Sequence, residues 1–142
     1  MIPDSIISAM QRQIGTVERS PDELPKVFTC LDVLGLSADQ QVREFFENFK
    51  LSGVLSSRPQ ELLDLCSPTQ QIEEATEFGR SIYEITEDFV CLTSGEGEGF
   101  ILYSKRDGRV YDVSVRQLDD LEAGKIDATW QSFFDLIEWY LS

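Results

Sequence analysis

The chain has 142 residues, and its 26 acidic and 12 basic residues give a formal net charge of −14. A chain of this length is expected to form one domain, and it can bury roughly 70% of its unfolded surface, enough to hold a core without disulfides. The charge argues against nucleic acid or an anionic membrane as a partner, since both require a cationic face that replaces counterions.

The first 36 residues are predicted to contain two helical segments separated by prolines. Apolar residues between positions 4 and 17, among them Ile14 and Val17, fall mostly on one face of a helix. Pro21 and Pro25 are expected to end that helix, because proline removes a donor and fixes the backbone. The apolar segment 27–36 favours a short helix that ends at Gly35, and a strand remains the alternative.

The next segment, 37–53, is predicted to be an amphipathic helix. Residues 37–40 have the form of a capping box, and the helix is expected to stop near Gly53. Its apolar stripe has helical spacing and consists of Val42, Phe45, Phe46 and Phe49. Three phenylalanines on one stripe could suggest a ligand site, but we interpret them as core residues.

Two further helices are predicted before residue 85. Pro59 opens a possible short helix through Leu65, and residues 67–70 form a second capping signature with Pro68 at the first helical position. The buried stripe expected for that helix consists of Ile72, Ala75, Phe78 and Ile82. Glu73, Glu74 and Glu77 lie on its other side, and we interpret them as a solvated face rather than as a metal site.

Three short strands are predicted at residues 89–92, 100–103 and 110–115, which are rich in β-branched and aromatic residues. Glycines separate the first two strands, and Asp107-Gly108 is a strong hairpin signal between the last two. Both faces of the middle strand are apolar, which indicates a central strand covered on both sides. The predicted fold is α+β, with an antiparallel sheet of three to five strands, a central meander near residues 88–115, and flanking helices.

The C-terminal part is predicted to end in an amphipathic helix. Residues 116–127 are polar and favour a loop or a fourth edge strand, with a turn at Ala123-Gly124. The last helix is expected to start near Thr129 and to pack deeply against the sheet. Its apolar stripe comprises Trp130, Phe133, Phe134, Ile137 and Leu141, widened by Leu136 and Tyr140.

The sequence provides little support for catalysis. Cys30, Cys66 and Cys91 are widely spaced among apolar residues, and the chain has no histidine, so we expect buried thiols rather than a thiol enzyme or a zinc site. The loop 95–99 alternates glycine with glutamate, and its charge would repel a phosphate. Because 26 carboxylates produce many chance pairs, no acid–base pair stands out. We expect no enzymatic activity, no metal and no cofactor.

A local charge contrast distinguishes the second hairpin from the rest of the chain. Between Lys105 and Arg116 there are four basic and two acidic residues, in an otherwise acidic molecule. These cations could simply protect a sheet edge or could orient a partner, and the acidic remainder could be only a solvated surface. The candidate partner-binding residues are Glu96, Glu98, Lys105, Arg106, Arg109, Asp119 and Asp120.

The chain resembles the SUKH superfamily, which groups bacterial immunity proteins with yeast cell-wall-synthesis regulators. The resemblance rests on residues 85–90, on the glycine-rich stretch 93–99, on residues 102–112 and on the closing aromatic segment that begins at Trp130. The first half is similar to the family mainly in its order of helices, and residues 34–36 and Phe45-Phe46 are the positions in this half that match the family best. The Leu-Pro start that the family has before an early helix is absent, and Leu36-Ser37-Ala38 stands there.

The resemblance implies a single SUKH-like α+β domain with a non-enzymatic binding role. Many such bacterial proteins neutralise toxins, often nucleases, and a nuclease presents a cationic cleft that an acidic protein could occlude. We therefore expect a cytoplasmic immunity-type protein that binds a basic partner. The alternatives are an intracellular scaffold or regulatory module without a toxin, and an unrecognised hydrolase. The N-terminus lacks the features of a secretory signal, and no apolar run approaches the roughly 20 residues of a membrane span.

Overall fold

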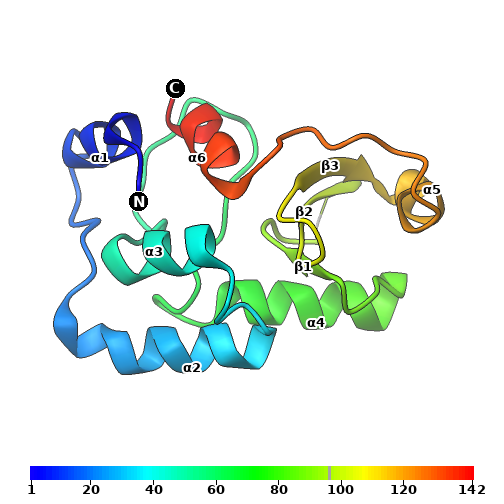
Figure 1. Cartoon of the computed structure of the whole chain (residues 1–142), viewed down its shortest axis with the longest axis horizontal. Coiled ribbons are helices and arrows are strands. Elements are labelled where there is room, and N and C mark those ends of the chain that lie inside the picture. The colour runs from blue at the N-terminus through cyan, green and yellow to red at the C-terminus, as the bar shows by residue number, and fades with distance from the viewer. Residues whose placement is uncertain (96) are drawn as a thin grey trace.

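The computed structural model describes residues 1–95 and 97–142 and has the predicted α+β architecture. Figure 1 shows α1, α2, α3 and α6 grouped on one side, the sheet with α5 on the other, and α4 running along both. The helices are α1 (Asp4–Gln11), α2 (Leu24–Leu34), α3 (Gln40–Asn48), α4 (Gln71–Tyr83), α5 (Leu118–Glu122) and α6 (Phe133–Leu141). The strands are β1 (Phe89–Cys91), β2 (Gly99–Ser104) and β3 (Val110–Ser114), and short 3-10 turns occupy Pro21–Glu23 and Val115–Gln117.

The three strands form an antiparallel meander in the order β1-β2-β3. Tyr103 of β2 lies opposite Val90 on one side and opposite Val110 on the other. The predicted meander is therefore confirmed, with β2 at its centre and with three strands in the described part of the chain.

The two faces of β2 contribute to two separate hydrophobic clusters. Ile101 and Tyr103 belong to the larger cluster, which includes buried residues of α1, α2, α3 and α6. Phe100 and Leu102 point the other way, into a smaller cluster with residues of α4 and α5. Because successive side chains of a strand alternate between faces, this arrangement confirms the predicted central strand with apolar cover on both sides.

The larger cluster is built around aromatic rings from α3 and α6. Phe45 and Phe46 are fully buried, and the ring of Phe133 lies 5.8 Å from Phe45 and 5.9 Å from Phe46 between centroids. Phe49 is buried beside them. The α3 stripe is thus part of the core, as expected from its spacing.

The C-terminal helix is present, but it begins later than predicted and packs mainly against other helices rather than against the sheet. It starts at Phe133, after Ser132, whose hydroxyl accepts a hydrogen bond from the backbone N–H of Asp135. Trp130 instead forms an isolated β-bridge with Val110. α6 packs against α1 and α3 and contacts the sheet through Phe133, whose ring meets Tyr103 edge-on.

Two N-terminal boundaries differ from the predictions. α1 ends at Gln11, and Ile14, expected on a buried helical face, is 91% exposed. Val17 is buried, but in an extended segment in which Glu18 forms a β-bridge with Phe49. That bridge also ends α3 at Asn48 rather than near Gly53, because Phe49 adopts an extended conformation. The helix predicted for residues 27–36 is confirmed as α2, capped by Gly35 with φ 73°.

The predicted capping boxes are wrong at both helices. α3 follows Asp39, not Ser37, and the Asp39 carboxylate accepts a 2.7 Å hydrogen bond from the Tyr103 hydroxyl. Burial, together with this carboxylate, raises the pKa of Tyr103. α4 starts at Gln71, so Pro68 lies outside it, and residues 59–65 contain no helix. The residue that precedes α3 thus uses its side chain for a tertiary contact and makes no side-chain cap hydrogen bond.

Residues 116–127 do not form a fourth strand, and only their second part, 123–127, is a loop. They contain the end of a 3-10 turn and helix α5, whose Leu118 and Leu121 are buried in the smaller cluster. The turn predicted at Ala123-Gly124 is present, with Gly124 at φ 73°. A short helix fits here because the leucines three residues apart fall on one helical face.

A buried ion pair joins distant parts of the helical half. The side chains of Arg19 and Asp64 are both 0% exposed, and Arg19 Nη2 lies 3.3 Å from Asp64 Oδ1. Asp64 also accepts hydrogen bonds from the backbone N–H groups of Leu51, Cys66 and Ser67. Arg19 donates to the carbonyl oxygens of Phe46 and Phe49. The pair fixes three loop segments that would otherwise leave backbone groups without partners.

Glu23 extends this pair toward the surface and predicts an acid-sensitive contribution to stability. Partial burial acts to raise the pKa of Glu23, but hydrogen bonds from the backbone and hydroxyl of Ser20, the Arg19 guanidinium and the charge of Lys50 lower it from 4.5 to about 2. The contribution is therefore complete above the unfolded value and is lost as pH falls toward 2. We expect Glu23→Gln to lower the free energy of unfolding by about 1 to 2 kcal/mol at pH 7.

Urea denaturation between pH 7 and pH 2 measures this effect, and the difference between Glu23→Gln and wild type should shrink as pH falls below 4. Asp22→Asn, at an exposed neighbour in the same turn, serves as the control. A difference of unchanged size at pH 2 would show that the charge of Glu23 is not its cause.

Candidate protein-binding surfaces

The predicted partner-binding residues lie at two ends of the sheet rather than in one patch. Glu98 directly precedes β2, whereas Lys105 and Arg106 directly follow it. The six residues of β2 separate Glu98 from Lys105, a span of roughly 20 Å. Glu96 lies outside the described residues. The two ends must therefore be considered as separate surfaces.

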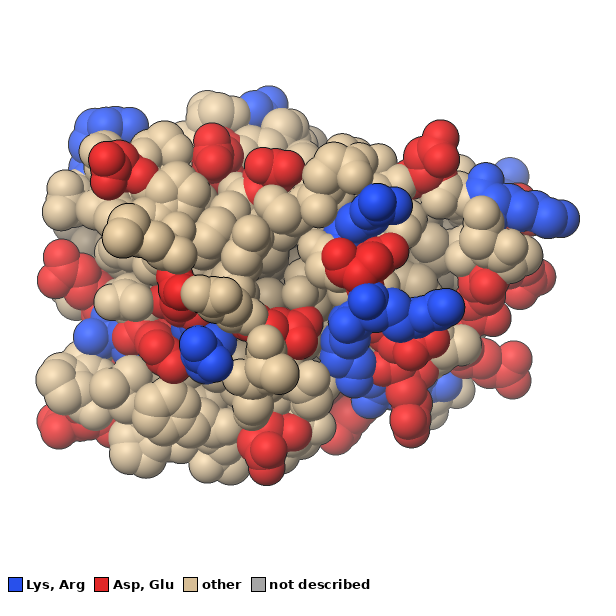
Figure 2. All heavy atoms as spheres, in the orientation of Figure 1, with Lys and Arg blue, Asp and Glu red and all other residues tan. Residues whose placement is uncertain are grey.

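Basic side chains gather around the β2–β3 turn, with acidic ones between them, as Figure 2 shows. Lys105 Nζ donates a 3.0 Å hydrogen bond to the carbonyl of Leu34, at the C-terminal end of α2, where a cation is favoured by the helix dipole. Arg106 is 3.8 Å from Asp88, and both are exposed or half-exposed. Arg109 is exposed. Lys105 thus has a structural role, and the two arginines are the accessible cations of this turn.

A groove of about 470 Å³ separates this turn from the segment after α5. Arg106 and Arg109 line one part of it, and Glu122 and Asp127 line another. Asp119 and Asp120 are exposed on α5 but do not line the groove. The mixed charge gives this groove no clear preference for an anion or a cation.

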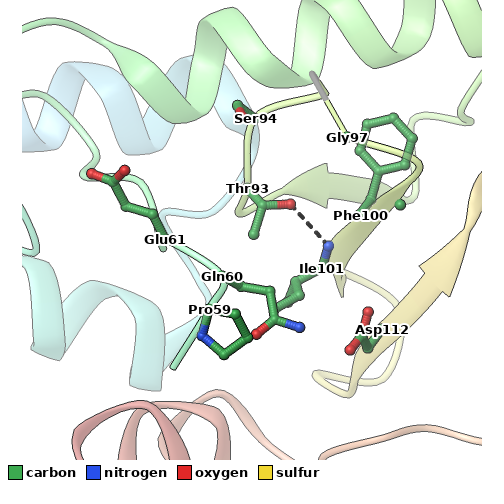
Figure 3. Close-up of a pocket in the computed structure, with 10 residues that line it drawn as sticks. Pro59, Gln60, Glu61, Thr93, Ser94, Gly97, Phe100, Ile101 and Asp112 are labelled. Carbon is green, nitrogen blue, oxygen red and sulfur yellow. Dashed lines mark hydrogen bonds between the residues drawn. The ribbon is translucent and has the colours of Figure 1, made fainter. Parts of the chain in front are cut away.

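At the other end, a cavity of about 360 Å³ lies between residues 59–61, the sheet, and Thr93, Ser94 and Gly97 (Figure 3). Thr93 Oγ1 accepts a 3.1 Å hydrogen bond from the Ile101 backbone N–H and so holds the loop to β2. Burial raises the pKa of Asp112, which faces Gln60 in Figure 3, while Glu61 points away from both. The two lining carboxylates do not converge, so this cavity lacks the arrangement of an acid–base pair.

Helix α4 presents an apolar surface that the periodicity analysis placed in the core. Ile72, Ala75, Thr76 and Gly79 are buried, whereas Phe78 is 44% and Ile82 is 58% exposed. A Cβ atom on Gly79 would lie 2.9 Å from the Ile85 side chain and 3.0 Å from Cys91 Sγ. The helix therefore approaches the sheet through Gly79, its smallest residue. With the Gly79 side of α4 against the sheet, Phe78 and Ile82 face outward.

Phe78 borders a hollow between α4 and the glycine-rich loop. Its ring lies against the backbone of Gly95, where an added Cβ would come within 2.8 Å of the ring, and it meets Tyr83 edge-on. The hollow has a volume of about 320 Å³ and is also lined by Leu63, Ala75 and Glu74. Glu98, a predicted partner-binding residue, follows the glycine-rich loop that contains Gly95. The predicted acidic loop therefore lies beside the apolar surface at Phe78, which was not predicted.

The three thiols are buried, as expected from their apolar neighbours. Burial raises the pKa of Cys91 to about 12 and also raises the pKa of Cys30 and Cys66. Such thiols remain protonated at neutral pH and are poor nucleophiles. In residues 1–95 and 97–142, no cluster of three or more potential ligand side chains is placed to hold a metal ion. The described helices also include none with the length and apolar character required to cross a membrane.

Comparison of the chain with protein-family models, with curated proteins and with solved structures produced no match in any of the three. The resemblance to the SUKH superfamily therefore stays a prediction from the sequence.

Proposed function

We propose that this chain is a non-enzymatic binding domain of the immunity type, which acts in the cytoplasm by binding and neutralising a basic protein such as a nuclease toxin. The observation that carries the proposal is the net charge of −14, combined with an exposed aromatic surface on the acidic helix α4. A negative field speeds encounter with a cationic partner, and an exposed aromatic residue supplies the short-range contact.

The surface chemistry supports binding more than catalysis. The carboxylates around the cavity beside Thr93 and Ser94 diverge, and the thiols are buried with raised pKa values. The SUKH resemblance of residues 85–112 agrees with this proposal, because it implies binding of a toxin by direct contact. A scaffold or regulatory role without a toxin would use the same surfaces and differs only in the partner.

Co-purification with the product of the adjacent gene, at about 50 mM and about 500 mM salt, tests the proposal. We expect a complex at low salt whose affinity falls at high salt, because exposed charges are screened beyond roughly 10 Å at 0.1 M ionic strength. If the adjacent gene encodes a toxin, its activity should be lost in the complex. Absence of a complex at low salt would contradict the immunity role, and a non-toxic partner would favour the regulatory one.

A further inference from the structure

We propose that the α4 surface, defined as Glu74, Glu77, Phe78, Ile82 and the adjoining Gly95, is a docking site for a lysine- or arginine-rich amphipathic segment of a partner protein. This inference rests on the proposed function and names the face that it uses. An apolar side chain of the segment occupies the hollow beside Phe78, and its cations lie over the glutamates.

The outer side of α4 carries a row of exposed side chains with helical spacing. Glu74, Phe78 and Ile82 are four residues apart and form one row along the helix. Phe78 and Ile82 are 44% and 58% exposed, and Leu63 and Ala75 line the hollow beside Phe78. Phe78 is held in place between Gly95 and Tyr83, so it can contact a partner without much loss of conformational entropy.

The charges around this row determine the kind of segment that fits. Residues 71–87 contain five acidic residues and one basic residue, Arg80. The Arg80 guanidinium is turned back toward the sheet, where it donates to the carbonyl oxygens of Glu87 and Phe89. The glutamates on the outer face are therefore not neutralised by it. An apolar centre bordered by one sign of charge favours a segment that is apolar in the middle and basic at its edge.

Another pair of exposed apolar residues lies on α2 and provides an internal comparison. Phe28 is 49% and Val33 is 61% exposed, which is similar to Phe78 and Ile82. Their helix carries one lysine and one aspartate, Lys26 and Asp32, so its charge is balanced. Charge complementarity therefore selects α4 over α2 as the face for a basic partner.

A synthetic peptide with alternating blocks of lysine and leucine, acetyl-LKKLLKLLKKLLKL-amide, tests the site by amide chemical-shift mapping. A control peptide carries serine in place of every leucine and keeps the same charge. We expect the largest shifts at residues 74–84 and 94–95, and an affinity at least tenfold weaker for the control peptide. Largest shifts on α2 or at the β2–β3 turn, or no binding at millimolar peptide, would overturn the inference.

Matched variants separate local contact from overall charge. Phe78→Ala is expected to weaken peptide binding at least tenfold, and Phe28→Ala less than twofold. Ile82→Lys and Val33→Lys form a second pair with the same expected contrast, in case Phe78→Ala disturbs the loop at Gly95. Glu74→Gln with Glu77→Gln, and Asp119→Asn with Asp120→Asn, each remove two charges from −14 and leave −12.

Only the glutamate double variant is expected to weaken the peptide complex by more than threefold. Equal effects of the two double variants would show that net charge alone governs binding, and would overturn the site.

The same variants distinguish this inference from the proposed function. If the adjacent gene product binds wild type and all α4 variants equally well, the docking site is wrong and the binding role remains. If that product does not bind while the peptide maps to α4, the proposed partner is wrong and the site remains.

Discussion

Replacement of Asp64 by alanine is expected to lower the free energy of unfolding by about 3 to 5 kcal/mol, because it leaves the buried Arg19 charge without its partner. The substitution also removes the acceptor of the backbone N–H groups of Leu51, Cys66 and Ser67. The donors of Leu51 and Cys66 are then left buried without a bond, which costs more than the bond itself contributes. Urea denaturation at pH 7 measures the loss.

Asp120→Ala is the matched control, since it removes an exposed carboxylate of the same size from α5. A surface substitution of this kind changes stability by no more than about 0.5 kcal/mol. Asp64→Asn should fall between the two, because asparagine retains one acceptor oxygen but not the charge. A loss of less than about 1 kcal/mol for Asp64→Ala would contradict the role of the pair as the anchor of the three loops.

Replacement of Phe45 by alanine is expected to lower the free energy of unfolding by about 3 to 5 kcal/mol, the range found for phenylalanine in a packed core. Phe45 is 0% exposed, and its ring contacts those of Phe46, Phe49 and Phe133. The substitution removes both the buried area and the edge-to-face contacts between α3 and α6. Thermal and urea unfolding of the variant measure the effect.

Phe28→Ala removes the same side chain from a site that is 49% exposed, and it should cost about 1 kcal/mol or less. The contrast between the two variants tests whether the α3 phenylalanines are core residues. If Phe45→Ala retained wild-type stability, the α3 stripe would have a role other than packing, such as lining a ligand site.

The strands and the α3 stripe could be predicted because their signals are local. β-branched and aromatic residues between glycine-rich turns favour strands, and the alternation of β2 places apolar residues on both faces. The α3 phenylalanines repeat with helical spacing on one face and are buried there. In both cases the side chains that define the element are also the ones that pack.

The two ends of α3 could not be predicted because long-range contacts engage the residues that flank it. The bridge between Glu18 and Phe49 ends α3 at Asn48, although the two bridged residues are 31 positions apart. Asp39 precedes α3 while its carboxylate accepts from Tyr103, which lies 64 positions away. Capping signatures describe only the local competition for hydrogen bonds.

The candidate site was predicted only in part for the same reason. The sequence indicated an acidic loop and a basic turn, and the structure places them at opposite ends of β2. It also brings the exposed Phe78 beside Gly95, a neighbour that helical periodicity could not supply. The useful signal was Gly79, since a glycine within a helix can mark a face that approaches another element closely.

The sequence by itself determined the net charge, the antiparallel meander and the aromatic core stripe, because composition, alternation and helical spacing act between near neighbours in the chain. The tertiary structure decided which face of α4 is buried and which charged residues lie inside. Arg19 and Asp64 stand 45 positions apart, and nothing near either one indicates a buried pair. Only the folded arrangement brings them together, because a buried charge is stable only when its partner and its remaining hydrogen bonds are all in place.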